Sequence, residues 1–195
     1  MLKYKKSEHT KQRILAKANE LFSENGYQAT GVDQITESIG MTSGVFYNHF
    51  KSKSDLLNDI IQHKIQRSSE LLLVVQEKES AYAWVQRALR VYLSREHRDS
   101  KTNSCPLTTL STEIVQLDLQ QQTGLMQYTQ SFAEILQRRL LILSPGNKSK
   151  AHAIMAMCVG AVQLARLEKD DMKSMQILNE TYQACLQLIT QRTAV

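Results

Sequence analysis

The residue in this sequence whose side chain is best placed for a chemical reaction is Cys105, which lies directly before Pro106. Proline is favoured at the first position of a helix, so the thiol is predicted to occupy the N-cap position. A helix N-terminus stabilises a thiolate, and the cations Arg98 and Lys101 lie just before it in the chain. A thiol in this setting can act as a sensor of electrophiles or oxidants, or it can cap and pack the helix. Both interpretations stay open.

An enzymatic use of Cys105 has little else to support it. A nucleophilic cysteine needs a base, and His97 is the only histidine nearby in the sequence. The chain has no nucleophile elbow, no glycine-rich phosphate loop and no clustered carboxylates on a helix face. A thiol-dependent enzyme is therefore the weaker alternative, and no cofactor is expected. The three cysteines, Cys105, Cys158 and Cys185, are far apart and lack CxxC spacing, which predicts reduced thiols and no metal site.

The positive charge of the sequence is concentrated at its N-terminus. The formal net charge is +5, and residues 1–17 hold Lys3, Lys5, Lys6, Lys11, Arg13 and Lys17 against the single Glu8. A basic arm before a small helical unit suits a DNA backbone, and a solvated tail is the alternative. No apolar run approaches the ~20 residues of a membrane helix, and the polar start does not fit a signal peptide. We therefore expect a cytoplasmic protein without membrane contact.

The composition favours helices throughout the chain. Hydrophobic residues make up 42% of the sequence and charged residues 22%, whereas only 7 Gly and 2 Pro are present among the 195 residues. Such a chain can bury a core and has few turn residues, so an all-α fold is expected. The expected helices cover residues 7–25, 30–40, 43–50, 56–77, 81–96, 106–116, 121–143, 149–168 and 173–191.

Boundary signals separate these helices. Asn25-Gly26 is predicted to close the first helix, and Thr30 with Asp33 has the form of a capping box for the second. The polar residues 98–103 are predicted to form a loop. Breaks are expected at 144–147 and at 170–171.

Residues 30–50 have the pattern of a helix-turn-helix. This motif needs two short helices at a steep angle, a turn that tolerates glycine, and apolar side chains that hold the pair rigid. Gly40 falls at the turn, and the packing can come from Ile35, Ile39, Met41 and Phe46. The second helix would present its N-terminal residues to base edges, while polar groups around it hold phosphates.

Residues 11–57 closely resemble the DNA-binding head of the TetR/AcrR (tetracycline-repressor-like) family of transcriptional regulators. The match includes Leu21-Phe22, Gly26-Tyr27, Thr30, the helix from Ile35 to Gly40, and the signature Phe46-Tyr47-Asn48-His49-Phe50-Lys51-Ser52-Lys53. The resemblance implies about nine helices, with a DNA-binding head at residues 1–53 and an effector-binding and dimerisation body at 54–195. It also implies a homodimeric repressor on a palindromic operator in double-stranded DNA, with an activator of the same fold as the alternative.

The resemblance further implies roles for individual residues of the head. Phosphate contacts are implied for Thr30, Tyr47, His49 and Lys53. The reading of base edges is implied for Ser43, Gly44 and Val45, with Asn48 as a further candidate. Many relatives carry lysine at the position of Ser43, which puts an inherited operator sequence in doubt.

For the body, the resemblance implies a small-molecule effector and dimerisation through the last two helices. The helix at 149–168 is rich in small residues, namely Ala153, Ala156, Gly160, Ala161 and Ala165, and the last helix carries the stripe Leu178, Tyr182, Cys185 and Ile189. Pocket candidates, each of which is equally a core candidate, are Trp84, Leu107, Met126, Phe132, Met155 and Cys158.

Residues 104–113 also look like a motif of one branch of the family. That branch includes the repressor of N-ethylmaleimide reductase, which senses electrophiles through a cysteine in this place. Because the motif also occurs in members not known as thiol sensors, a structural role for Cys105 stays open.

Overall fold

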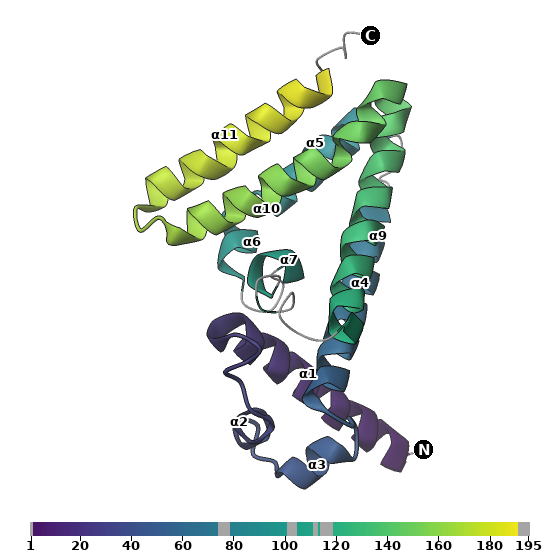
Figure 1. The fold of residues 1–195 in the computed structure, drawn as a ribbon, viewed down its shortest axis with the longest axis vertical. Coiled ribbons are helices and arrows are strands. Elements are labelled where there is room, and N and C mark those ends of the chain that lie inside the picture. Colours follow the sequence, from purple (N-terminus) through teal and green to yellow (C-terminus); the bar gives the residue numbers. More distant parts are fainter. Residues whose placement is uncertain (1, 74–78, 101–104, 111–112, 114–118, 191–195) are drawn as a thin grey trace. The chain divides into compact units, whose positions relative to one another are not determined.

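The structure, a computed structural model, describes residues 2–73, 79–100, 105–110, 113 and 119–190. Every regular element within these residues is helical, which confirms the all-α fold. The helices are α1 (Leu2–Asn25), α2 (Val32–Glu37), α3 (Ser43–Tyr47), α4 (Lys53–Leu73), α5 (Ala81–Tyr92), α6 (Arg95–Asp99), α7 (Pro106–Thr109), α9 (Leu119–Leu143), the 3-10 helix η1 (Pro145–Lys150), α10 (Ala151–Leu167) and α11 (Asp171–Thr190) (Figure 1).

Contacts between backbone segments divide the chain into two compact units. Unit 1 comprises residues 1–64 and 101–128, and unit 2 comprises residues 65–100 and 129–195. Helices α4 and α9 contribute residues to both units. The predicted boundary after residue 53 divides the DNA-binding head from the effector-binding body by function. The two units are defined by contacts instead, so this boundary stays a prediction.

Unit 1 contains the three predicted helices of the head. Helix α1 begins at Leu2, earlier than predicted, and ends at Asn25 as predicted. Gly26 follows with φ +86°, and its N–H donates to the carbonyl of Phe22 at 3.1 Å, so glycine ends the helix in the left-handed conformation. The buried core of these helices and of the start of α4 includes Ile14, Ala18, Phe22, Ile35, Phe46, Phe50, Leu56 and Leu57.

Unit 2 contains the antiparallel pair α10 and α11, which lie side by side in Figure 1. The small residues Ala161 and Ala165 of α10 are buried, as is the predicted stripe Leu178, Tyr182, Cys185 and Ile189 of α11. This stripe is therefore core of a single chain and cannot itself be a free dimerisation surface.

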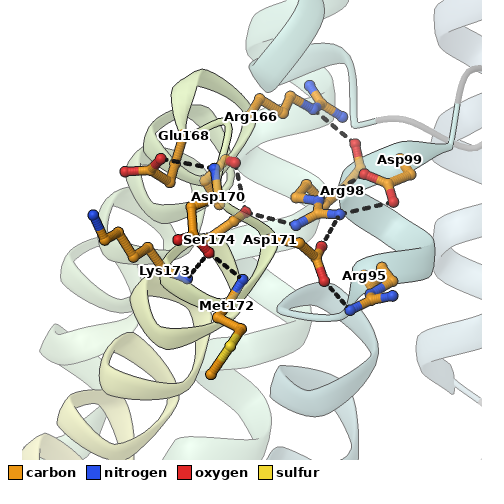
Figure 2. A network of polar contacts seen from close by, with 11 residues as sticks. Arg95, Arg98, Asp99, Arg166, Glu168, Asp170, Asp171, Met172, Lys173 and Ser174 are labelled. Atoms are coloured by element: carbon orange, nitrogen blue, oxygen red, sulfur yellow. Dashed lines mark hydrogen bonds and ion pairs between the residues drawn. The ribbon is translucent and has the colours of Figure 1, made fainter.

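The predicted loop beginning at Arg98 is wrong for its first two residues, which end helix α6. The Arg98 guanidinium donates to Asp99 at 2.6 and 2.9 Å, to Asp171 at 3.0 Å and to the hydroxyl of Ser174 at 2.6 Å (Figure 2). The fully buried Ser174 in turn donates to the carbonyl of Ala165 at 2.6 Å. Partners more than 70 residues away thus hold α6 in place, which a local polar pattern cannot indicate.

The predicted break at 144–147 is confirmed, because α9 ends at Leu143 and the 3-10 helix η1 precedes α10. In η1 the buried Asn147 side chain donates to the carbonyl of Ile189 at 3.0 Å. The capping box at Thr30 is wrong, because Gly31 is the N-cap of α2 and no side-chain hydrogen bond caps the helix there. The predicted end of the helix at residue 77 lies outside the described residues.

Candidate nucleic-acid interface

Helices α2 and α3 form the predicted helix-turn-helix, and backbone bonds fix the turn between them. Gly40 adopts φ +69°, and the N–H of Met41 returns to the carbonyl of Thr36 at 2.9 Å. Thr36, which replaces the small alanine common in such motifs, is fully buried, and its hydroxyl donates to the carbonyls of Val32 and Asp33, both at 3.1 Å. The departure is therefore accommodated inside α2, because the buried hydroxyl has partners.

Helix α3 divides into a packed side and an open side. Phe46 is fully buried and Phe50, just beyond the helix, is 2% exposed; their ring centroids are 5.4 Å apart. Tyr47 is 59% exposed although its ring edge meets Phe46. Gly44 and Asn48 are exposed, and Ser43, Val45 and His49 are partly exposed. The residues predicted to read bases are thus brought together on one short helix with access to solvent, while their DNA contacts stay predictions.

The Ser43 hydroxyl has a partner that sequence reasoning missed. Ser43 Oγ donates to Oδ1 of Asp33 in the first turn of α2. A serine hydroxyl has a single proton, so this bond leaves its lone pairs to face outward as acceptors. Asp33 thereby leaves Ser43 to act toward other molecules as a hydrogen-bond acceptor and not as a donor.

Thr30 is placed differently from its predicted role. The residue is fully buried, and its hydroxyl donates to the carbonyl of Gly26 at 2.7 Å and of Leu21 at 3.3 Å. The expectation of a phosphate-facing hydroxyl is corrected, because that hydroxyl holds the loop between α1 and α2 to the end of α1.

Lys53 has a similar internal role. Its ammonium donates to the carbonyl of Tyr27 at 2.9 Å and of Thr30 at 3.0 Å, with a longer contact of 3.4 Å to Gln28. The same nitrogen lies 4.4 Å from the centre of the Tyr27 ring. Partial burial lowers the pKa of Lys53 below its usual value, and the charge of Glu113 opposes that shift. A clamp on a DNA phosphate would compete with these bonds, and it stays a prediction.

Part of the basic arm is also engaged within unit 1. Lys11 forms an ion pair with Asp59 at 2.7 Å, and this hydrogen bond raises the pKa of Lys11 despite some burial. Arg13 donates to the carbonyl of Ile39, at the helix-turn-helix turn, at 2.8 Å. Lys17 pairs with Glu20 at 3.0 Å. Arg13 therefore braces the helix-turn-helix, Lys11 joins α1 to α4, and Lys17 pairs within α1. Charge counting could not separate these roles from DNA binding.

The pocket candidates fall into two groups. A cavity of about 30 Å³ in unit 2 is lined by apolar and aromatic side chains, among them Trp84, Phe132, Met155 and Cys158. Leu107 and Met126 do not line it, and Met126 is 68% exposed on α9. A cavity of this size holds about one water molecule, so a larger effector would have to widen it.

Cys105 occupies the N-cap of α7, with Pro106 next to it, as predicted. The thiol is buried, at 4% exposure, and its Sγ lies 3.6 Å from the hydroxyl oxygen of Tyr128. The effect of the two cations on the thiol stays a prediction. Arg98 belongs to unit 2 and is paired with Asp99 and Asp171, and Lys101 lies outside the described residues.

Comparison with known proteins adds independent information about the head. Residues 14–60 match the family model described as bacterial regulatory proteins, tetR family. The transcriptional regulator AcrR of Shigella flexneri is 39% identical over 72 residues, which is 37% of this chain and 34% of AcrR. An uncharacterised HTH-type transcriptional regulator of Lactococcus lactis is 27% identical over 169 residues, covering 83% of this chain and 86% of that protein. The chain thus aligns with about a third of the length of AcrR.

Solved structures extend the likeness of the fold to nearly the whole chain. The reduced form of NemR from Escherichia coli superposes with a TM-score of 0.79 over 95% of this chain and 100% of NemR, at 17% identity. A TetR transcriptional regulator from Chloroflexus aurantiacus gives a TM-score of 0.81 over 96% and 98% of the two chains, at 21% identity. At these identities the structures show a shared fold alone. Residues 14–60 thus match the tetR family of bacterial regulatory proteins, and nearly the whole chain shares its fold with these two structures.

Proposed function

We propose that this protein is a DNA-binding transcriptional regulator, acting as a repressor on a palindromic site in double-stranded DNA. The observation that carries the proposal is the open side of α3. Polar and small residues there, including Ser43, Gly44 and Asn48, face solvent, while buried Phe46 anchors the helix. This is how a recognition helix offers base-reading groups to the major groove from a rigid support.

The relatives support a regulator over an enzyme. Those named above are described as transcriptional regulators, which favours this class over a thiol-dependent enzyme. His97, the one base considered for Cys105, stacks on Tyr92 with ring centroids 4.5 Å apart in unit 2. An activator with the same head would bind DNA equally well, because the position of the site relative to the promoter decides between the two.

We propose a homodimer formed through the outer faces of α10 and α11. Leu164, Leu167 and Met172 are 58%, 79% and 84% exposed near the turn between these helices. Along α10, Gly160 has open space where a Cβ would be, and Ala153 and Ala156 are exposed, so another helix can approach closely. Exposed apolar side chains gathered on small-residue helices are typical of a protein interface. Two heads in a dimer would read the two halves of a palindrome.

Two forms of effector control are proposed for the body. A small molecule could widen the apolar cavity around Trp84 and Met155, or an electrophile could modify Cys105. Burial of Cys105 against Tyr128 makes modification dependent on local opening, and it also means that a modified thiol cannot fit without displacing its neighbours. Because its target is DNA, we place the protein in the cytoplasm. No helix within the described part of the chain is long and apolar enough to cross a membrane.

The proposal is tested by a mobility-shift assay on the DNA that flanks the protein's own gene. We expect a shift at moderate salt that Asn48→Ala and Tyr47→Ala weaken and that Arg138→Ala, an exposed charge change on α9 in unit 2, leaves intact. Absence of any shift by the wild-type protein would count against a DNA-binding regulator.

The same assay separates the two forms of control when diamide or N-ethylmaleimide is added. Under thiol sensing, Cys105→Ser still binds DNA but is not released by either reagent. Normal release of this variant would remove Cys105 as the sensor. If neither reagent releases the wild-type protein or Cys105→Ser from DNA, control by a ligand in the cavity would be favoured.

A further inference from the structure

The loop between α1 and α2 is contacted by an acidic side chain from far along the chain. Oε2 of Glu113 accepts the backbone N–H of Gln28 at 2.8 Å. Glu113 belongs to the body by sequence but lies in unit 1 together with the whole head. This contact therefore joins the segment that follows Cys105 to the DNA-binding head within one compact unit.

Gly26 makes the contact possible from the other side. A Cβ at this position would collide with the carboxylate of Glu113, and the φ of +86° already favours glycine. The absence of a side chain thus lets the Glu113 carboxylate approach the loop backbone. A loop that needs glycine both for its own conformation and for its partner is closely matched to that partner.

Lys53 completes the arrangement with the opposite charge. Glu113 takes a backbone N–H of the loop, whereas the Lys53 ammonium takes the carbonyls of Tyr27 and Thr30. An anion thus accepts a hydrogen bond from the loop and a cation donates to its carbonyls, and charge-assisted hydrogen bonds of this kind are stronger than neutral ones. The loop in turn leads directly into α2 of the helix-turn-helix.

We infer that Glu113 is a positioning residue for DNA binding, through which the segment following Cys105 sets the α1–α2 loop and with it the helix-turn-helix. The inference rests on the proposed DNA-binding function. A held loop presents α2 and α3 in one orientation, and loss of the contact spreads that orientation over several, which costs affinity. Glu113 need not touch DNA for this effect.

The test measures binding of full-length variants to a duplex that the wild-type protein selects from a randomised pool. Removing a carboxylate raises the positive charge of the protein, which by itself strengthens binding to DNA. We expect the opposite for Glu113→Ala, a loss of about tenfold, as for one charge-assisted hydrogen bond. Glu134→Ala is the matched control, because Glu134 is an exposed carboxylate on α9 that accepts from Gln130 of the same helix at 3.2 Å. It should bind as tightly as wild type or slightly more tightly.

A second readout follows the contact itself. Hydrogen exchange at the Gln28 amide should accelerate in Glu113→Ala and stay slow in Glu134→Ala. Glu113→Gln keeps an acceptor oxygen and should restore part of both the protection and the affinity. If Glu113→Ala does not fold, Glu113→Gln carries the test. The Gly26→Ala, Glu113→Ala double variant should lose less affinity than the sum of the single losses, because both changes disrupt one contact.

The outcomes separate this inference from the function on which it rests. If the wild-type protein selects no duplex, the proposed function fails and the inference with it. If the wild-type protein binds and Glu113→Ala binds equally well, the inference alone is overturned. Fast exchange of the Gln28 amide with unchanged affinity would likewise overturn it, since the contact would then exist without positioning the head.

Discussion

Replacing Lys53 by methionine should destabilise unit 1 by a measurable amount. The change keeps most of the side-chain length but removes the ammonium and with it the cation–π contact with the Tyr27 ring. The carbonyls of Tyr27 and Thr30 then lose their donor. Because they lie in the loop that leads into α2, the effect should be felt in the head and not in unit 2.

The size of the loss follows from the bonds that disappear. Two are short, at 2.9 and 3.0 Å, and the third, to Gln28, is weak at 3.4 Å. A hydrogen bond to a charged group contributes about 1.5 kcal/mol, and the partial desolvation of the ammonium offsets some of this gain, so we expect a net loss of about 2 kcal/mol. For a protein of about 200 residues this lowers Tm by roughly 4–8 °C.

Lys51→Met is the matched control, assayed beside Lys53→Met by thermal unfolding followed by circular dichroism. Lys51 is exposed, and its replacement removes the same charge from the same signature. We expect Lys51→Met to stay within about 0.5 kcal/mol of wild type. Equal Tm values for the two variants would refute the anchoring role of Lys53. An unchanged Tm with a larger loss of DNA binding than in Lys51→Met would instead support the phosphate clamp.

Three further changes test other parts of the structure. Thr30→Val should lower the free energy of unfolding by about 1–2 kcal/mol, because it removes a buried hydroxyl with two carbonyl partners. Thr30→Ser keeps the hydroxyl and should lower it less. Equal free energies of unfolding for the two variants in chemical denaturation would contradict this. Ser43 donates its hydroxyl hydrogen bond to Asp33, so it should accept from base pairs that present an amino donor, adenine N6 or cytosine N4. We expect it to favour these bases over others by about 1–3 kcal/mol. Asp33→Ala should relax that preference in selection from a random pool, and an unaltered base profile would exclude the role of Asp33. Arg98 holds the pKa of Asp99 below its usual value of 3.8, so this half-exposed carboxylate stabilises the fold above that pH by less than about 1 kcal/mol, and the contribution disappears as pH falls through the lowered pKa. Urea unfolding of Asp99→Asn and wild type should therefore differ at pH 7 and converge once the pH falls below the lowered pKa of Asp99, and an undiminished difference in acid would contradict the assignment.

The helices and the helix-turn-helix could be predicted because their signals are local. Apolar periodicity, Gly26 and Gly40 each act within a few residues of themselves, and the structure places them as expected. The partners of Thr30, Lys53 and Arg98 could not be predicted in this way. The contacts of Lys53 and that of Arg98 with Asp171 join residues more than 20 positions apart in the sequence, the latter at a separation of 73, and those of Thr30 reach back from a loop into the end of α1. No pattern within one helix encodes them.

The same difference limits what a family motif says about a side chain. A motif match carries residue types into place, and Tyr47 and Asn48 do lie on the open side of α3. It does not carry the direction of a hydroxyl or an ammonium, and in unit 1 those of Thr30 and Lys53 point to backbone carbonyls. The residues of the signature therefore have two roles. Some are accessible for contact with DNA, whereas others hold the two helices in the orientation that DNA binding requires.

These two roles can be separated by experiment, because a substitution can weaken DNA binding tenfold while the protein remains almost fully folded. A domain with an unfolding free energy of about 5–15 kcal/mol remains more than about 99% folded at 25 °C after a loss of 2 kcal/mol. Unfolding then cannot account for a tenfold loss of DNA binding in Lys53→Met or Glu113→Ala. Such a loss at 25 °C would have to come from the geometry of the folded head, and the loop from Gly26 to Thr30 is the part of that geometry which both side chains hold.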